Sequence, residues 1–356
     1  MTHLQKFQAL LRERGAAALI SSHANIFYLS GFSFEDGYLL ICPEAAYLLT
    51  DARYSEAAEN EAACGFTVLA PKGPMLAAIR ELMAGEGAAL LLVEEDDLTV
   101  AVYDRLVKGL APAVLAHGGS ELLARLRVCK DADEIAAIRE AQRITDAAYT
   151  HILGYIKPGV RELDVALELE FFMRRMGASG PAFDTIAVSG SASSLPHGVP
   201  RDRVLEKGFL TMDFGARYRG YCADMTRTVV IGRADNEMKR LYRTVLAAQE
   251  AALDLIGEGI FCSAADRVAR DIIDKSGYEG LFGHSLGHGV GIDVHEAPRL
   301  SGKAGDAVLT RGHVVTVEPG IYLAGKYGCR IEDLVVIGEG GRIENLTKSP
   351  KELIEL

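Results

Sequence analysis

The sequence predicts a two-domain protein of mixed helices and strands, in which a small α/β domain precedes a larger domain. Strand patterns alternate with helix patterns through the N-terminal third, which is typical of an α/β layer. A long helical pattern then begins at Asp131 and marks a second domain. With 356 residues, 49% of them hydrophobic, the chain is long enough to bury two cores. We therefore expect one domain over residues 1–124 and another over residues 131–356.

The first domain opens with a predicted amphipathic helix from Leu4 to Arg14, which ends at Gly15. This start is not a signal peptide, because no continuous apolar core follows a basic beginning. The patterns after it predict, in order, two strands within residues 38–50, a helix near 52–63, a strand over 89–96 and a helix that ends near residue 109.

The second domain begins with a predicted helix that has Asp131 as its N-cap. Glu134 follows three residues later and completes a capping box. Further helices are expected over 161–176, 235–256 and 263–276, the last with Ser263 as N-cap and Gly277 beyond its end. Strands lie between these helices, and inspection of the sequence reveals no internal repeat.

Composition excludes several classes of partner. The net charge is -11 and no run of Lys and Arg occurs, which argues against a nucleic-acid partner. No apolar run approaches the roughly 20 residues of a membrane span. The six cysteines are scattered without a CxxC pair, as suits small buried side chains in a reducing compartment. We therefore expect a cytoplasmic protein with neither a nucleic-acid nor a membrane partner.

Five potential metal ligands follow one another through the C-terminal half: Asp213, Asp224, His288, Glu318 and Glu332. Four carboxylates and one imidazole suit two hard divalent cations, and soft donors are too few for a structural zinc. A lone aspartate in a hairpin is ordinarily solvated. Both aspartates stand in apolar strand patterns, however, where an unpaired carboxylate is costly. Together the five residues favour metal binding over solvated surface charge.

The two aspartates lie symmetrically about a turn at residues 217–220. In a hairpin with that turn their Cβ atoms would face each other about 5 Å apart. A cation between them would remove the repulsion, and a second one held by His288 and Glu318 would lie about 3.5–4 Å away. Glu332 has another explanation, an ion pair with Arg330, and we expect that pairing alongside metal ligation.

The ligand set and its order resemble the pita-bread metallopeptidases, the family of methionine aminopeptidase, aminopeptidase P, prolidase and creatinase. All five ligands of that family have a counterpart here. Residues 17–32 and 48–62 resemble the smaller domain that only the prolidase, aminopeptidase P and creatinase branch carries. The resemblance implies an α+β pita-bread catalytic domain preceded by a creatinase-like N-terminal α/β domain. It also implies a homodimer in which the small domain, through residues 31–37, helps to cover the partner's site.

The same resemblance implies a role for each site residue. Two divalent metal ions activate a water molecule, and Glu318 moves its proton. His197 and His295 match histidines that bind substrate and stabilise the oxyanion of the tetrahedral intermediate without ligating metal. His284 belongs to the substrate pocket, and Arg330 supports the ligands. Manganese is the metal we expect, with cobalt, iron or zinc as alternatives.

The implied substrates are small peptides with proline in the second position. The nitrogen of an X-Pro bond is tertiary and lacks the N–H that general peptidases use. Arg299 matches the position at which prolidases carry an arginine for the free carboxylate of a dipeptide, although it could also be a plain surface arginine. We therefore expect a prolidase, that is, an Xaa-Pro dipeptidase. Two alternatives stay open: an aminopeptidase P, and a metal-free pita-bread module that binds peptides or proteins, which the complete ligand set disfavours.

Overall fold

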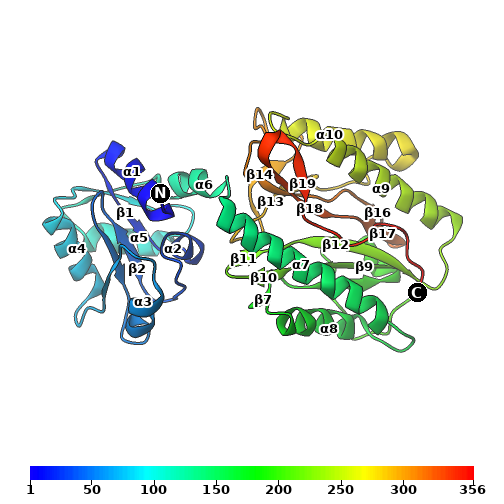
Figure 1. Ribbon diagram of the computed structural model, residues 1–356, viewed down its shortest axis with the longest axis horizontal. Coiled ribbons are helices and arrows are strands. Elements are labelled where there is room, and N and C mark those ends of the chain that lie inside the picture. The colour runs from blue at the N-terminus through cyan, green and yellow to red at the C-terminus, as the bar shows by residue number, and fades with distance from the viewer. The chain divides into compact units, whose positions relative to one another are not determined.

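The structure is a computed structural model that describes residues 1–356. It divides into two compact units, Met1–Arg127 and Val128–Leu356 (Figure 1). Both units combine helices with sheets, which confirms the predicted mixed fold class. None of the helices has the length and apolar composition that a membrane crossing requires.

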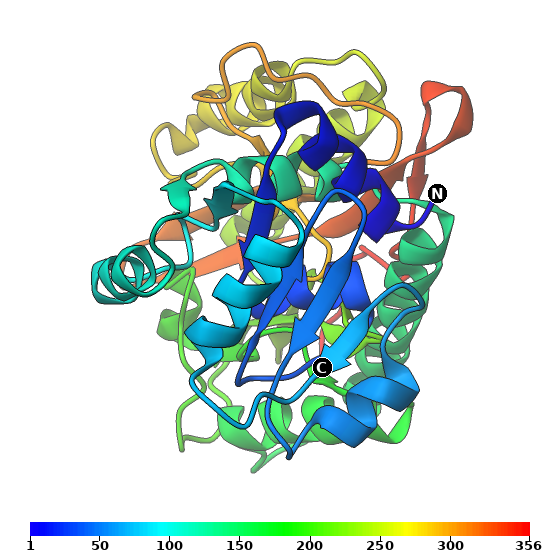
Figure 2. The same cartoon turned by 90° about the vertical axis from the view of Figure 1, so that its left-hand side faces the viewer.

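The N-terminal unit alternates strands with helices. Its strands are β1 (Ala17–Ile20), β2 (Tyr38–Ile41), β3 (Ala46–Leu49), β4 (Thr67–Leu69), β5 (Leu90–Val93) and β6 (Val114–Ala116). Its helices are α1 (His3–Arg14), α2 (His23–Ser30), α3 (Ser55–Glu61), α4 (Met75–Gly85), α5 (Val100–Gly109) and α6 (Gly119–Arg127). The strands form one sheet in the order β4-β3-β2-β1-β5-β6, onto which Figure 2 looks.

Helix α1 matches its prediction at both ends. Thr2 and Gln5 form a capping box at its start, and Gly15 ends it in the left-handed conformation with φ of 60°. Leu4, Phe7 and Leu11 form its buried face. Local capping chemistry and the spacing of apolar residues thus account for this element.

The C-terminal unit holds four long helices and two main sheets. The helices are α7 (Ala132–Tyr155), α8 (Glu162–Arg175), α9 (Asn236–Leu255) and α10 (Cys262–Ile273). The strands are β7 (Gly180–Pro181), β8 (Ile186–Ser189), β9 (Gly208–Phe214), β10 (Ala216–Tyr218), β11 (Tyr221–Cys222), β12 (Met225–Ile231), β13 (Gly287–Gly289), β14 (Glu296–Leu300), β15 (Val314–Val317), β16 (Gly320–Leu323), β17 (Tyr327–Arg330), β18 (Asp333–Ile337) and β19 (Ile343–Asn345).

Two helix pairs cover these two sheets. Helices α7 and α8 share a buried core with the sheet β12-β9-β8, and α9 and α10 share another with the sheet β14-β13-β15-β18-β19 (Figure 1). Smaller sheets, β11-β10-β7 and β16-β17, extend the strand ends. The strand pairs β9–β12 and β15–β18 are antiparallel, and one lies in each of the two main sheets.

The two halves repeat one another, although inspection of the sequence alone did not reveal it. After α7 and α9 the chain makes the same turn, with Gly159 and Gly259 at positive φ of 93° and 81°. A second trace of the repeat is a Thr-x-acid-x-Gly motif at the ends of β9 and β15, over residues 211–215 and 316–320. The repeat therefore places one acidic residue at an equivalent point in each half.

Helix boundaries in this unit follow the predictions closely except at α10, which ends at Ile273 and continues as a π turn over 274–278 that contains Gly277. Asp131 and Glu134 form the predicted capping box of α7. Ser263, however, is not the N-cap of α10, because the helix already begins at Cys262 with Phe261 as its N-cap. A bridge to Val308 holds Phe261 extended, which places the N-cap two residues earlier than predicted.

Candidate metal centre

Each residue of the predicted ligand set lies on a strand or directly beside one. Asp213 is the penultimate residue of β9, and Asp224 directly precedes β12. Glu318 directly follows β15, and Glu332 directly precedes β18. His288 is the middle residue of β13. The carboxylates thus come from the neighbouring ends of two antiparallel strand pairs, one in each half of the unit.

The two aspartates do not face each other as predicted. The strands pair so that Asp213 lies opposite Thr226, two residues beyond Asp224. The hairpin turn is Arg219–Gly220 instead of 217–220: both turn residues have positive φ, 46° and 81°, as a two-residue turn of this kind requires, and pairing resumes on either side. Because side chains alternate between faces, a register error of two residues leaves both aspartates on one face of the hairpin.

Asp224, His288 and Glu332 form a tight buried group in which one ligand atom of each lies within 4.8 Å of the others. The Nε2 atom of His288 is 3.6 Å from Asp224 Oδ2 and 3.4 Å from Glu318 Oε1. Its Nδ1 atom lies 3.1 Å from the carbonyl oxygen of Gly289 and must donate to it. Burial lowers the pKa of His288 to about 4, so the ring is neutral at physiological pH. The free lone pair on Nε2 therefore points among the carboxylates, as metal ligation requires.

Burial, together with neighbouring negative charge, disfavours ionisation of these carboxyl groups. Burial and then the charge of Glu332 raise the pKa values of Asp224 and Glu318 well above their usual range. Burial and then Asp213 raise the pKa of Glu332 to about 8. The group can ionise fully only if positive charge lies among the oxygens.

One oxygen of the group has no hydrogen-bond partner. Asp213 Oδ2 accepts from Arg330 Nη2 at 2.6 Å, but Asp213 Oδ1 is buried and unpaired. A buried acceptor without a partner costs about 1–3 kcal/mol, and more when it is charged. A cation satisfies such an oxygen. Carboxylate oxygens and one imidazole nitrogen suit divalent ions such as manganese or cobalt, so the residues present fit a bound metal.

Arg330 lies behind the carboxylates, but its ion-pair partner is Asp213 and not Glu332, which corrects the predicted pairing. Arg330 ends β17 and Glu332 precedes β18, and these strands belong to different sheets, so alternation along one strand does not relate the two side chains. The hydroxyl of Thr226 links them instead. It accepts from Arg330 Nε at 2.8 Å and donates to Glu332 Oε2 at 2.7 Å.

Tyr322 completes a hydrogen-bond chain that the sequence did not reveal. Its hydroxyl accepts from Arg330 Nη1 at 2.8 Å and lies 2.9 Å from Nε2 of His284. The Nδ1 atom of His284 must donate to the carbonyl oxygen of Ser285 at 2.9 Å, so Nε2 accepts the hydroxyl proton. Burial lowers the pKa of His284 to about 3, which keeps this ring neutral. The only sequence clue is the position of Tyr322, four residues after Glu318, within an apolar strand pattern.

The predicted ligands and the predicted substrate residues line one cavity of about 530 Å³. His197, His295 and Arg299 reach it from the surrounding loops and from β14, and all three are exposed. The ring of His295 lies edge-on to that of His288, with their centroids 4.3 Å apart. Arg299 stands opposite His288 in the strand register. Partial desolvation by the surrounding cavity, followed by the positive charge of Arg299, lowers the pKa of His295, which favours the neutral ring.

Comparison with known proteins gives matches over both units. A family model described as metallopeptidase family M24 matches residues 136–339, and one described as the creatinase/prolidase N-terminal domain matches residues 3–129. The chain is similar to an uncharacterized peptidase of Bacillus subtilis, with 41% identity over 99% of both chains. Among solved structures, it is similar to an Xaa-Pro dipeptidase from Bacillus anthracis, with 40% identity, a TM-score of 0.94 and 99% of both chains covered. It is also similar to an X-Pro aminopeptidase from Thermotoga maritima, with 38% identity, a TM-score of 0.89, and 96% of this chain and 97% of that one covered.

Proposed function

The chain belongs to metallopeptidase family M24, with the N-terminal domain of the prolidase and aminopeptidase P branch, and from that premise we propose that it is a two-metal Xaa-Pro dipeptidase. It hydrolyses the bond between an N-terminal residue and a C-terminal proline. The observation that carries the proposal is a single cavity in which the buried group of Asp224, His288 and Glu332 adjoins Arg299. The similarity to the Xaa-Pro dipeptidase from Bacillus anthracis over the whole chain supports it.

The residues that would hold the metal ions are the five predicted ligands: Asp213, Asp224, His288, Glu318 and Glu332. When bound, two divalent ions lower the pKa of a water molecule and polarise the scissile carbonyl group. Manganese is the expected metal, with cobalt, iron or zinc as alternatives, because oxygen and imidazole donors accept all four.

Glu318 is the residue that we assign to proton transfer. Its Oε1 atom accepts from the Thr316 hydroxyl at 3.3 Å, and its Oε2 atom lies 3.8 Å from Nδ1 of His284. As a carboxylate, Glu318 takes the proton of the attacking water. As a carboxylic acid, it returns that proton to the proline nitrogen, which must be protonated when the C–N bond breaks.

His197 and His295 line the same cavity as the ligands, and their ring N–H groups supply hydrogen bonds to substrate. Attack by water turns the scissile carbonyl oxygen into an oxyanion. An N–H donor aimed at that oxygen stabilises the transition state more than the ground state. Because His295 packs against the ring of His288, it is well placed for this role.

Replacing His295 with alanine is expected to lower kcat about 100-fold, in the range for the loss of one oxyanion donor. The metal content of the purified protein should not change, because His295 is not assigned as a ligand. Steady-state kinetics and elemental analysis of the variant measure both. As a control, His117→Ala removes an exposed histidine of the N-terminal unit and should leave both quantities as in the wild type. A variant of His295 with an unchanged kcat would make its role structural, and one that loses metal would make it a ligand.

Arg299 decides the choice of substrate in this proposal. Its guanidinium group is exposed in the cavity and can take the free carboxylate of a C-terminal proline in a charge-assisted pair. In an Xaa-Pro-Yaa peptide that carboxylate is an amide, so the pair cannot form.

Replacing Arg299 with alanine is therefore expected to lower kcat/KM for Ala-Pro by about 10 to 100-fold, which corresponds to a hydrogen bond to a charged group of about 1.5–3 kcal/mol. Amidated Ala-Pro-NH2 lacks the charge, so it should be a poor substrate of the wild type and should respond little to the substitution. Equal losses on both substrates would show that Arg299 does not read the carboxylate.

Aminopeptidase P activity, which releases the N-terminal residue from Xaa-Pro-Yaa peptides, is the second candidate. The similarity to the X-Pro aminopeptidase from Thermotoga maritima favours it. A homodimer, in which residues 31–37 help to cover the partner's site, and a cytoplasmic location stay predictions that rest on the family resemblance. Sedimentation of the purified protein tests the first of these.

Metal dependence tests the proposal against a metal-free binding module. Elemental analysis of the purified protein should find divalent metal, chelation should abolish Ala-Pro hydrolysis, and added Mn²⁺ should restore it. A protein that carries no metal and hydrolyses no Xaa-Pro peptide after loading with manganese, cobalt, iron or zinc would overturn the proposal.

A further inference from the structure

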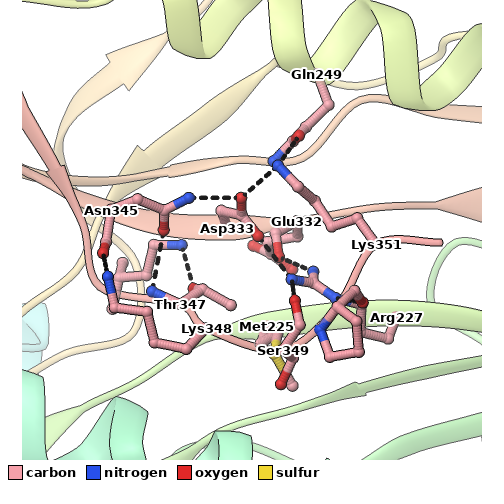
Figure 3. Close-up of polar contacts among 12 residues, drawn as sticks. Met225, Arg227, Gln249, Glu332, Asp333, Asn345, Thr347, Lys348, Ser349 and Lys351 are labelled. Atoms are coloured by element: carbon pink, nitrogen blue, oxygen red, sulfur yellow. Dashed lines mark hydrogen bonds and ion pairs between the residues drawn. The ribbon is translucent and has the colours of Figure 1, made fainter.

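We infer that Arg227 is a positioning residue for the metal centre, and that it ties the C-terminal segment, residues 345–351, to the strand ends that carry Asp224 and Glu332. The inference rests on the proposed function, because it takes Glu332 as a metal ligand. Figure 3 shows the contacts: the guanidinium group of Arg227 lies between Asp333 beside Glu332 and Ser349 of the C-terminal segment.

Arg227 is buried, at 1% exposure, yet every one of its five N–H donors has an acceptor. Nε donates to the carbonyl oxygen of Pro350 at 3.1 Å. The two Nη1 donors and the two Nη2 donors take main-chain oxygens and one carboxylate, namely Thr226 O at 3.0 Å, Glu332 O at 2.6 Å, Asp333 Oδ1 at 2.8 Å and Ser349 O at 2.8 Å. One planar group therefore fixes β12, the start of β18 and the C-terminal segment together.

These contacts reach the metal centre through Thr226 and Glu332. The carbonyl oxygen of Thr226 accepts from Arg227 and also from the N–H of Glu332, at 3.1 Å. The Thr226 hydroxyl donates to the side chain of Glu332, and Asp224 lies two residues before Thr226 on the same strand path. Any shift between the two strands moves one carboxylate relative to the other. Arg227 resists that shift because it binds the carbonyl oxygens of both strands.

The C-terminal segment is also anchored to two helices and to Asp333. Asp146 on α7 accepts from the N–H and the hydroxyl of Ser349, at 2.8 and 2.6 Å. Lys351 Nζ donates to Asp333 Oδ2 and to Gln249 Oε1 on α9, both at 2.9 Å. Asp333, the residue next to Glu332, accepts from Lys351 of the segment with Oδ2 and from Arg227 with Oδ1, and so links the segment to Arg227 (Figure 3).

Net stability is a weak explanation for such a network. Taking Arg227 and Asp333 out of water offsets much of their attraction, so buried ion pairs often stabilise no more than apolar side chains would. Arg227, whose five donors all have acceptors, does, however, select one arrangement of the groups that it binds. The arrangement selected here is the spacing of the two strand ends that carry Asp224 and Glu332.

Arg227→Lys tests the inference, because lysine keeps the positive charge beside Asp333 but cannot reach the carbonyl oxygens of both strands and the segment together. Isothermal titration of the metal-free protein with Mn²⁺ should give a dissociation constant raised at least about tenfold, the lower end of the range for groups that support metal ligands. Amide hydrogen exchange in residues 345–351 should slow when wild-type protein binds Mn²⁺ and should respond less in the variant.

A second variant approaches the network from its far side. Asp146→Ala releases Ser349 without touching Glu332, and it should also weaken Mn²⁺ binding. If Arg227→Lys does not fold, this second variant tests the positioning role instead. The matched control is Arg139→Lys on the same helix, whose ion pair with Glu344 is about half exposed and should leave Mn²⁺ affinity unchanged.

The outcomes separate this inference from the proposed function. If wild-type protein binds Mn²⁺ and a folded Arg227→Lys variant binds it equally well, the positioning role is wrong while the metallopeptidase proposal stands. If Arg227→Lys does not fold, and the Asp146→Ala variant folds and binds Mn²⁺ like the wild type, the positioning role is also wrong while the metallopeptidase proposal stands. If wild-type protein binds no divalent metal at all, both the proposed function and this inference are wrong.

Discussion

Replacing Asp224 with alanine is expected to remove one or both metal ions and nearly all hydrolysis of Ala-Pro. Asp224 is buried, its Oδ2 atom lies 3.6 Å from Nε2 of His288, and it belongs to the tight group with His288 and Glu332. Without Asp224, the proposed metal pair loses a ligand, and the charges of Asp213 and Glu332 are compensated less well. Elemental analysis and kinetics with Ala-Pro give the two readouts. The melting temperature of the metal-free variant should stay close to that of the metal-free wild type. Burial disfavours the ionised form of the Asp224 carboxyl group when no metal is bound, so its removal costs little stability.

Asp184→Ala is the matched control for this experiment. Asp184 lines the same cavity but is exposed and lies outside the buried group. The Asp184→Ala variant should therefore keep the full metal content. An Asp224→Ala enzyme with two bound metals and full activity would overturn the ligand assignment.

Replacing Glu318 with glutamine is expected to lower kcat by about 10²–10⁴-fold, the contribution usual for a general acid–base group. The amide keeps the shape of the side chain and one ligand oxygen but cannot carry a proton from water to the proline nitrogen. The measurement is kcat at saturating Mn²⁺, with metal content determined on the same sample. Glu279→Gln, at an exposed glutamate, should behave as the wild type. A Glu318→Gln enzyme with near wild-type kcat would assign proton transfer to another group.

Helices with local capping signals were predictable from the sequence. The capping boxes of α1 and α7 involve residues three apart in the chain, so the pattern alone specifies them. The strands β1, β4 and β6 were not predicted; β4 and β6 have only three residues each, too few to show alternation. The start of α10 was missed because a tertiary contact, the bridge of Phe261 to Val308, sets it.

The candidate site was also predictable only in part. Residue types and their order suggested the ligand set, since carboxylates in apolar strand patterns call for a counter-charge. The hairpin register was wrong because the turn uses Arg219, a non-glycine residue at positive φ that no simple rule would place there. The pairing of Arg330 with Asp213 joins two sheets, and the contact of Tyr322 with Arg330 crosses from β16 to β17, so sequence spacing reveals neither.

The repeat between the two halves also shows what sequence inspection misses. Asp213 and Glu318 occupy equivalent strand ends, but the motif they share has only three matched positions in five residues. Such a short match becomes visible only when the strands are superimposed by their place in the fold.

Comparison of Ala-Pro with Ala-Pro-Ala as substrates of the Mn²⁺-loaded enzyme tests the central claim most directly. The account predicts a higher kcat/KM for the dipeptide, because Arg299 can pair with its free proline carboxylate and the tripeptide offers none at that position. A higher kcat/KM for Ala-Pro-Ala, with free alanine as the released product, would contradict the dipeptidase assignment and establish aminopeptidase P activity in its place.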